Sequence, residues 1–218
     1  MNNDFWLERW ERSEIGFHQG EINPHLRQHW QELHRSTTGE VFVPLCGKSL
    51  DMMWLRQQGC NVLGVELSDI AVDDFYNENG LAASQSSVGK FQRYQAGGVQ
   101  ILCGDFFDLS KDDLSNVSAV YDRASLVALP PDMRERYAQH LVNILKPGTQ
   151  ILLITFDYPQ SEMQGPPFAV SVKEVEALYS KYADIRLLAQ EDVLMQNLRF
   201  KQRGVSRMEE QVFLLTLR

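Results

Sequence analysis

The stretch EVFVPLCGKSLDMMWLRQQGCNVLGVE, residues 40–66, decides the fold. It begins with a short β-branched and aromatic run that stops at Pro44, and it ends with a second apolar run, 61–66, that closes on an acidic residue. Between these runs the pattern over 50–58 is helical, and Gly59 is placed to end that helix. Strand, helix and strand in this order form a βαβ unit, which predicts a parallel sheet.

The same alternation continues along the rest of the chain. Helical patterns cover 71–79, 131–145 and 172–182, and strand patterns cover 99–103, 119–121, 150–156, 184–191 and 209–217. The expected fold is an α/β domain with a Rossmann-like, doubly wound and mostly parallel sheet, formed as a single domain over residues 1–218. The last two strand patterns have no helix between them, which indicates an antiparallel edge. The polar stretch 81–98 is interpreted as a flexible connection.

The N-terminal segment, residues 1–36, has a different composition, rich in charge and tryptophan. Two tryptophans four residues apart indicate one helix, and a second helix is predicted to begin with Asn23 as its N-cap and Pro24 in its first position. Phe17 lies in the glycine-flanked loop between them. This arrangement predicts a helical flap that can close over a ligand.

Composition excludes several classes of protein. The formal net charge of −8 would repel a phosphate backbone, so no nucleic-acid partner is expected. No apolar segment is long enough to span a membrane, and the first residues match no targeting signal, so a cytoplasmic protein is expected. A monomer is the default expectation, because nothing in the sequence indicates an oligomeric state. The 3 cysteines form no C-x-x-C pair and are interpreted as packed, reduced thiols. His25 and His29 lack a third ligand at metal spacing, so no metal is expected.

Chemistry is expected beyond the carboxyl ends of the strands, where ligands bind in open α/β sheets. Glu66 ends the second strand, about 20 residues after the first loop, where a carboxylate can accept both ribose hydroxyls of a nucleoside. The alternative is a solvated glutamate at a strand end. A carboxylate at this position also disfavours a ribose 2′-phosphate.

The loop after the first strand contains Gly47 but lacks the G-x-G-x-x-G pattern of dinucleotide sites. This absence weakens the reading as an NAD-dependent oxidoreductase. Gly47, Lys48 and Ser49 resemble the end of a P-loop, yet the first glycine of that motif would fall on Phe42. A nucleoside triphosphatase is therefore excluded.

Other strand ends carry further candidates, each with two readings. Asp105 and Phe106 suit an adenine site, as acceptor for the exocyclic amine and as packing surface, or they form a turn cap and a core ring. Arg123 either pairs with Asp122 or faces an anionic substrate. The local sequence pattern indicates no partner histidine that would make Cys46 a nucleophile. Cys46 is therefore interpreted as a packed side chain.

These residues, in this order, resemble the thiopurine S-methyltransferase family over nearly the whole chain. The most specific segments are FWLERW (5–10), GFHQ (16–19), VPLCGKSLDM (43–52), GVELS (64–68), YDRASLVA (121–128) and GPPF (165–168). In this family the Pro-Leu-Cys-Gly-Lys loop replaces the usual glycine-rich loop of methyltransferases.

The resemblance implies a class I methyltransferase sheet of seven strands, the last antiparallel, with an N-terminal helical flap. It implies S-adenosylmethionine as cofactor, contacted by Trp10, Leu45, Gly47, Glu66, Asp105, Phe106 and Arg123. It places the aromatic thiol substrate near Phe17, Arg123 and Arg199, with Arg203 a neighbouring candidate for the last position.

The implied activity is transfer of a methyl group to the sulfur of thiopurines or aromatic thiols. Such substrates ionise readily, so positioning residues are expected and no catalytic acid or base. Selenium and tellurium compounds would suit the same transfer, which suggests metalloid detoxification. Two alternatives stay open at this point: the NAD-dependent oxidoreductase, and a catalytically silent protein that binds S-adenosylmethionine.

Overall fold

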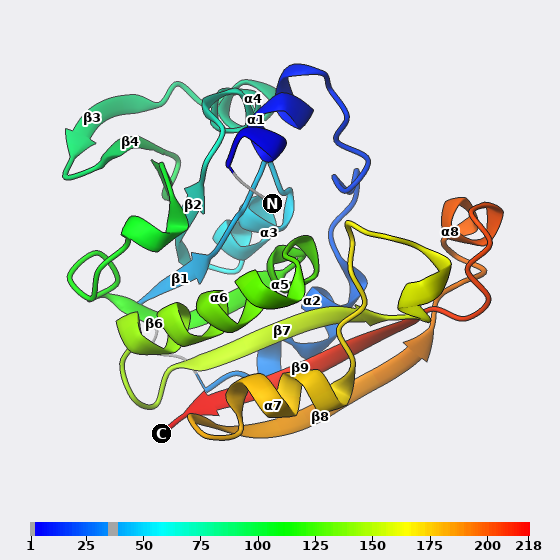
Figure 1. Ribbon diagram of the computed structural model, residues 1–218. Coiled ribbons are helices and arrows are strands. Elements are labelled where there is room, and N and C mark those ends of the chain that lie inside the picture. Colours follow the sequence, from blue (N-terminus) through cyan, green and yellow to red (C-terminus); the bar gives the residue numbers. More distant parts are fainter. Residues whose placement is uncertain (1–2, 35–38) are drawn as a thin grey trace. The chain divides into compact units, whose positions relative to one another are not determined.

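The computed structural model describes residues 3–34 and 39–218 (Figure 1). The chain divides into two compact units, the first ending at Tyr121 and the second running from Asp122 to Arg218. The single domain expected over residues 1–218 stays a prediction. Residues 1, 2, 35 and 36 of the predicted flap lie outside the described residues.

The first unit is built on the βαβ unit that the sequence predicts. Its elements are β1 (Glu40–Val43), α3 (Asp51–Gln57) and β2 (Asn61–Glu66), and β1 pairs with β2 in parallel. β2 also pairs in parallel with β5 (Val99–Cys103), and β1 with β6 (Val117–Arg123), which crosses into the second unit. α3 and α4 (Asp69–Glu78) pack on β2 and β5. The buried apolar run of β2 follows from its position inside this sheet.

The stretch 81–98 is not a flexible connection, and that prediction was wrong. It forms an antiparallel hairpin of β3 (Ser84–Val88) and β4 (Phe91–Ala96), and β4 pairs antiparallel with β5 (Figure 1). The described residues therefore contain nine strands instead of the seven that the family resemblance implied. β3 is a polar, mostly exposed strand, so it lacks the hydrophobic alternation by which strands are recognised.

The N-terminal segment contains α1 (Asn3–Glu11), α2 (Pro24–His29) and the 3₁₀ turn η1 (Trp30–Glu32). α2 begins as predicted, because the Asn23 side chain accepts hydrogen bonds from the backbone N–H groups of His25 and Leu26. α1 packs against α4 in the first unit (Figure 1).

One buried carboxylate joins the N-terminal segment to the βαβ unit. Asp51, at the start of α3, is 1% exposed. Its Oδ1 accepts from the N–H of Asn23 (2.9 Å), and its Oδ2 accepts from the hydroxyl of Tyr121 on β6 (2.8 Å). The sequence offered no signal for this role, since the two donors are far from Asp51 along the chain.

We expect Asp51→Ala to lower the free energy of unfolding by about 2 to 3 kcal/mol, because the substitution leaves two buried donors without an acceptor. Denaturant titration measures the change. Asp112→Ala, at an exposed position, is the matched control and should change stability by less than about 0.5 kcal/mol. Equal stability of the Asp51 and Asp112 variants would contradict the assigned role.

The second unit has a three-stranded antiparallel arrangement. Its elements are α5 (Ser125–Ala128), α6 (Pro131–Ile144), β7 (Gln150–Asp157), η3 (Gln160–Glu162), α7 (Val172–Tyr179), β8 (Ala183–Asp192), α8 (Leu198–Gln202) and β9 (Glu209–Leu217). β9 lies between β7 and β8 and is antiparallel to both, which confirms the expected antiparallel last strand. α7 packs on β8 and beside α6 (Figure 1). Among the described residues, every helix is too short or too polar to cross a bilayer.

Candidate cofactor and substrate site

Glu66 joins the loops that follow three strands of the first unit. Its Oε2 accepts from the N–H of Gly47 in the loop after β1 (2.8 Å), and its Oε1 accepts from the N–H of Ser68 after β2 (2.9 Å). Its backbone carbonyl accepts from the N–H of Gly104 after β5 (2.8 Å). The carboxyl ends of β1, β2 and β5 are thus connected at one residue, at the edge of the sheet where ligands bind in open α/β folds.

The Glu66 side chain is buried, with 6% of its surface exposed. Burial raises its pKa above the usual value for glutamate, and the N–H groups of Ser68 and Gly47 lower it in part. Each carboxylate oxygen accepts one of these two hydrogen bonds and can accept another, because an ionised carboxylate offers about four lone-pair positions. The side chain is therefore a buried acceptor rather than the solvated glutamate of the alternative reading.

The loop after β1 has a backbone shaped for close packing. Leu45 and Gly47 both have positive φ angles, 45° and 50°. A Cβ atom added to Gly47 would lie 3.3 Å from Cζ2 of Trp10, so the α1 tryptophan lies directly on this loop. Leu45, Gly47 and Trp10, which the resemblance assigned to one cofactor site, are therefore close together in the first unit.

The flap contributes an aromatic group to the same region. The ring of Phe17 lies 5.6 Å from Trp6 and 5.6 Å from Trp10, edge to face in both cases. Phe17 is half-buried, and Trp10 is buried. The predicted substrate contact Phe17 is thus positioned by the α1 helix that also covers Gly47.

Lys48 is bound to helix α4. Its Nζ contacts Asp74 (3.0 Å) and Glu78 (2.6 Å), and the side chain is 8% exposed. The pKa of Lys48 is raised by these two carboxylates, although burial opposes the rise. This lysine fastens the loop to α4, which agrees with the exclusion of a P-loop role.

Asp105 adopts the turn-capping role that the sequence left open. Its Oδ1 accepts from the N–H of Phe107 at the start of η2 (Phe106–Asp108), at 2.9 Å, and Phe106 is buried. Its Oδ2 accepts from the side-chain amide of Asn3 on α1 (2.9 Å). Sequence reasoning missed Asn3, because nothing local marks a residue that contacts a distant loop. Adenine binding by Asp105 and Phe106 stays a prediction.

The cysteines near Glu66 are not activated thiols. Cys46 is buried, and burial together with Glu66 raises its pKa well above the usual range. Burial and Glu66 also raise the pKa of Cys103 to about 11. High pKa values disfavour the nucleophilic thiolate, so the packing role predicted for Cys46 is supported. Among residues 3–34 and 39–218 there is no metal-binding group of His, Cys, Asp or Glu.

Arg123 lies in the second unit, at the end of β6, and is half-buried. The preceding carboxylate, Asp122, accepts a hydrogen bond from the hydroxyl of Tyr137 on α6 (2.7 Å). The following residue, Ala124, has a left-handed backbone with φ 69° and caps α5. Asp122 thus has Tyr137 as a partner. The local interpretation of the sequence considered only an ion pair between Asp122 and the neighbouring Arg123.

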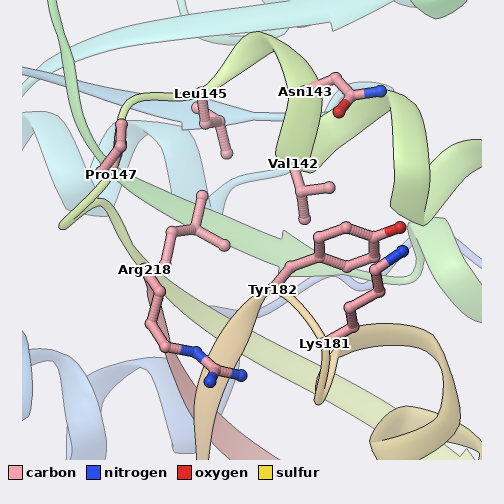
Figure 2. A pocket seen from close by; sticks show the side chains of 8 residues that line it. Val142, Asn143, Leu145, Pro147, Lys181, Tyr182 and Arg218 are labelled. Atoms are coloured by element: carbon pink, nitrogen blue, oxygen red, sulfur yellow. The ribbon is translucent and has the colours of Figure 1, made fainter.

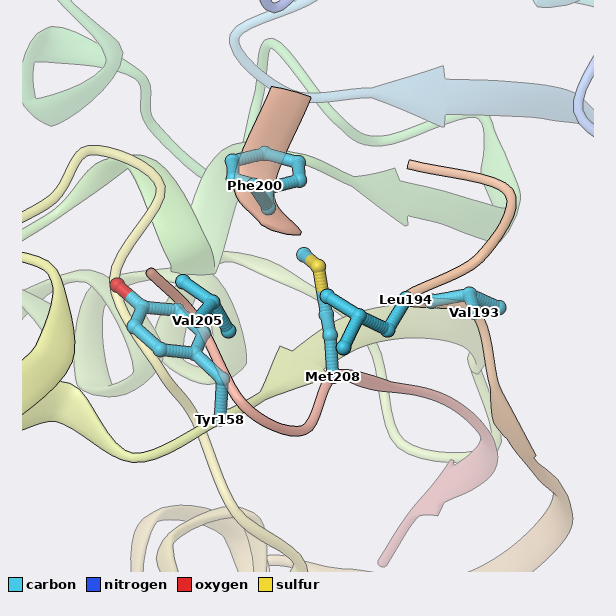
Figure 3. Close-up of a cluster of buried hydrophobic side chains, with 6 residues drawn as sticks. All are labelled: Tyr158, Val193, Leu194, Phe200, Val205 and Met208. Atoms are coloured by element: carbon cyan, nitrogen blue, oxygen red, sulfur yellow. The ribbon is translucent and has the colours of Figure 1, made fainter. Parts of the chain in front are cut away.

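Arg199 lies on α8, in the segment between β8 and β9. Its guanidinium carbon lies 4.9 Å above the ring of Phe200, and partial burial and the nearby Arg203 lower its pKa. Phe200 anchors the segment in a buried cluster shown in Figure 3, whose members are Tyr158, Val193, Leu194, Phe200, Val205 and Met208. The structure therefore leaves Arg199 and Arg203 as neighbouring candidates for the same role.

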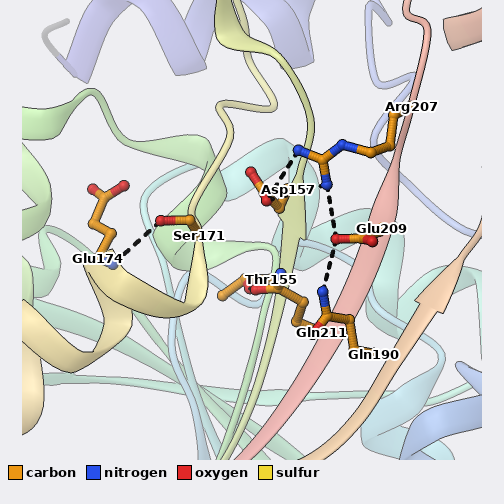
Figure 4. A network of polar contacts seen from close by, with 8 residues as sticks. All are labelled: Thr155, Asp157, Ser171, Glu174, Gln190, Arg207, Glu209 and Gln211. Carbon is orange, nitrogen blue, oxygen red and sulfur yellow. Dashed lines mark hydrogen bonds and ion pairs between the residues drawn. The ribbon is translucent and has the colours of Figure 1, made fainter.

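Polar contacts hold the part of the α8 segment that leads into β9. Arg207 contacts Asp157 at the end of β7 (3.4 Å) and Glu209 at the start of β9 (2.8 Å), as Figure 4 shows. Ser206 donates from its N–H to Glu162 on η3 (2.7 Å). The α8 segment is thus attached to β7, β9 and η3.

A pocket of about 180 Å³ lies elsewhere in the second unit (Figure 2). Its lining combines apolar side chains with two cationic ones, in full Val142, Asn143, Leu145, Pro147, Lys181, Tyr182, Leu217 and Arg218. No residue predicted for cofactor or substrate binding lines it. It lies beside the start of β7 and the end of β9, away from Asp157 at the carboxyl end of β7.

Solved structures identify the fold class. A methyltransferase dependent on S-adenosylmethionine from Anabaena variabilis matches with a TM-score of 0.69 at 14% identity, over 100% of this chain and 96% of that chain. The 1,6-didemethyltoxoflavin-N1-methyltransferase of Burkholderia thailandensis, solved with S-adenosylhomocysteine, matches with a TM-score of 0.64 at 12% identity, over 99% and 87% of the two chains. The fold is that of the S-adenosylmethionine-dependent methyltransferases.

Sequence comparison then identifies the family. The profile of the thiopurine S-methyltransferase family matches residues 1–218. A thiopurine S-methyltransferase of Nitrosospira multiformis is 61% identical over 218 residues, covering 100% of this chain and 99% of the relative. The chain belongs to the thiopurine S-methyltransferase family, which confirms the resemblance seen in the sequence.

Proposed function

We propose that the protein transfers a methyl group from S-adenosylmethionine to the sulfur of thiopurines and aromatic thiols. Membership of the thiopurine S-methyltransferase family over residues 1–218 carries this proposal. The enzyme is a methyltransferase whose cofactor is S-adenosylmethionine and whose partner is a small thiol. Its expected monomeric state and cytoplasmic location, and the expected lack of a nucleic-acid partner, belong to the same proposal.

The residues of the first unit fit the cofactor. Glu66 keeps acceptor positions for ribose hydroxyls, and its carboxylate is already oriented by the N–H groups of Gly47 and Ser68. Trp10 offers an apolar cover over the loop after β1. The ammonium group of Lys48 is paired with two carboxylates, which suits a cofactor without phosphates.

The reaction needs positioning more than proton transfer. When bound, S-adenosylmethionine supplies a methyl group on a positively charged sulfur. Glu66 and Asp105 would hold the nucleoside, and Phe17 would pack on the aromatic thiol. Arg123, with Arg199 or Arg203, would stabilise the ionised sulfur through charge-assisted hydrogen bonds. Holding the reactants in near-attack geometry lowers the barrier by several kcal/mol, and no residue has to remove a proton during transfer.

The two alternatives differ from this proposal in simple observables. An NAD-dependent oxidoreductase finds no support in the family match or in the loop after β1, which lacks the dinucleotide glycines. A silent protein would bind S-adenosylmethionine without turnover. Separate isothermal titrations with S-adenosylmethionine and NAD should show micromolar binding of the first alone. Binding of NAD alone would overturn the proposal.

A turnover assay with 6-mercaptopurine tests the methyl transfer and the role of Arg123 together. We expect S-methylated product from the wild type, and a kcat/KM lower by about 100-fold in Arg123→Ala, because a charge-assisted contact to the thiolate contributes about 1.5 to 3 kcal/mol. Arg136→Ala, at an exposed position of α6, is the matched control. Wild-type kinetics in Arg123→Ala would remove Arg123 from the site.

The natural acceptor is proposed to include selenium or tellurium compounds. Their soft, polarisable nucleophiles suit the same in-line transfer, which would make the enzyme part of metalloid detoxification. Cells that overproduce the protein should release volatile methylated selenium or tellurium products. Cells that overproduce the Arg123→Ala variant provide the comparison, and equal release from both would contradict this extension.

A further inference from the structure

Asp122 is a buried carboxylate beside a proposed substrate contact. It is 0% exposed, although it lies at the end of β6, where ligands are expected. Its Oδ2 accepts from the hydroxyl of Tyr137, at 2.7 Å. An ionisable group buried this completely is unfavourable unless it is hydrogen-bonded, so its presence calls for a physical explanation.

The contacts of Asp122 surround the backbone of Arg123. On one side, Asp122 is held by Tyr137 of α6 and interacts with Ser125 and the N–H of Leu126, both in α5. On the other side, Ala124 has the left-handed backbone, φ 69°, that residues other than glycine rarely adopt. Arg123 is therefore the residue between a buried anchor and a strained turn.

We propose that the ionised Asp122 carboxylate is a proton-sensitive positioning group, which holds the turn after β6 so that the Arg123 guanidinium faces the anionic substrate. The Tyr137 hydroxyl donates to Oδ2 of the ionised form, and the contacts of the carboxylate with Ser125 and the Leu126 N–H favour the same form. When Asp122 binds a proton, these charge-assisted hydrogen bonds weaken and the turn around Ala124 relaxes. This inference rests on the proposed function, because it assumes that Arg123 binds the thiolate.

The pH range of the effect follows from the surroundings of Asp122. Burial raises the pKa of Asp122 to about 6, while hydrogen bonds from Tyr137, Ser125 and Leu126 lower it in part. The titratable groups that interact with it from neighbouring helices are Tyr137 on α6 and Tyr179 on α7, and burial, followed by the charge of Asp122, raises the pKa of both. Neither tyrosine ionises near neutrality, so the carboxylate itself titrates in that range.

Positioning and simple electrostatics predict opposite results. Protonation of Asp122 removes a negative charge near Arg123, which by itself would strengthen binding of an anion. If Asp122 acts by holding the turn, protonation instead weakens anion binding. The sign of the pH effect therefore separates the two explanations.

The test measures binding of thiobenzoate, an aromatic sulfur anion that stays ionised from pH 5 to 8, to the protein saturated with S-adenosylhomocysteine. We expect the wild-type Kd to rise about tenfold as the pH falls from 8 to 5, with a midpoint near 6. Asp122→Asn should keep the weak, acid-like Kd throughout. Tyr137→Phe removes a donor that lowers the pKa of Asp122, so it should move the midpoint to higher pH.

Thermal unfolding provides a second readout that does not require a ligand. Because the folded state raises the pKa of Asp122 to about 6, buried charge destabilises the wild type above pH 6, and this penalty shrinks as the pH falls below 6 and is lost below the ordinary pKa of aspartate, about 4. The Tm of the wild type should therefore rise relative to Asp122→Asn upon acidification.

Three outcomes would overturn the inference. The midpoint near pH 6 could persist in Asp122→Asn, which would assign it to another group such as a histidine. Thiobenzoate could bind more tightly at low pH, which would favour electrostatics. The midpoint could stay unchanged in Tyr137→Phe. Failure of the wild type to bind S-adenosylhomocysteine at any pH would instead reject the proposed function, and the inference with it.

Discussion

Glu66→Gln is expected to raise the Kd for S-adenosylmethionine about 100-fold. The substitution removes a charge that would accept both ribose hydroxyls, and hydrogen bonds to charged groups contribute about 1.5 to 3 kcal/mol each. It also turns an amide group toward the N–H of either Gly47 or Ser68, since the two carboxylate oxygens accept one N–H each. Both the ligand and the loops therefore lose a partner.

Isothermal titration measures this effect, and a ligand analogue isolates its cause. The 2′,3′-dideoxy analogue of S-adenosylhomocysteine lacks the ribose hydroxyls, so the difference in affinity between wild type and Glu66→Gln should be much smaller for this analogue, with only the loop contribution left. Glu21→Gln, at an exposed position, is the control for a change of charge. An equally large difference with the dideoxy analogue would show that Glu66 acts only by holding the loops.

The pH dependence of cofactor binding should follow the ionisation of Glu66. Burial raises the pKa of Glu66, and the ionised carboxylate is the form that accepts hydrogen bonds. Affinity should therefore be full at neutral pH and fall upon acidification at a higher pH than an ordinary glutamate would cause.

Arg134→Ala is expected to lower the free energy of unfolding by about 3 to 5 kcal/mol. Arg134 on α6 is 1% exposed, and its guanidinium donates to the backbone carbonyls of Leu129 (2.8 Å) and Ala169 (3.1 Å). It also pairs with Glu174 on α7. Alanine would leave two carbonyls and a carboxylate without a donor, and it would open a cavity.

The loss of stability in Arg134→Ala should extend to the loop that contains residues 165–168. The guanidinium carbon of Arg134 lies 5.8 Å from the centroid of the Phe168 ring. The backbone N–H of Phe168 donates to the backbone carbonyl of Val127 (2.7 Å). Denaturant titration measures the stability, and Arg136→Ala on the same helix is the control, with an expected change below about 0.5 kcal/mol. If Glu174 is the counter-charge, the double variant lacking both side chains should lose less than the sum of the single losses. Additive losses would contradict that pairing.

The sequence alone determined the parallel core, the helix start at Asn23 and the antiparallel last strand. These features depend on local patterns: apolar runs of fixed period, capping residues and turn residues, all of which act within a few positions. The family followed from short motifs such as VPLCGKSLDM, because a loop of this composition replaces the glycines found elsewhere. Glu66 was also predicted from a local pattern, because it is the last residue of a recognisable buried strand.

Only the tertiary structure decided which distant groups meet. The hairpin β3–β4 was missed because its outer strand is polar and exposed, so that pairing with β4, and not hydrophobic periodicity, makes it a strand. The contacts of Asp51 with Asn23 and Tyr121, and of Asp122 with Tyr137, join residues far apart in the chain. Hydrogen bonds of this kind depend on the geometry of the folded chain, and burial shifts pKa values only once the surrounding side chains are in place.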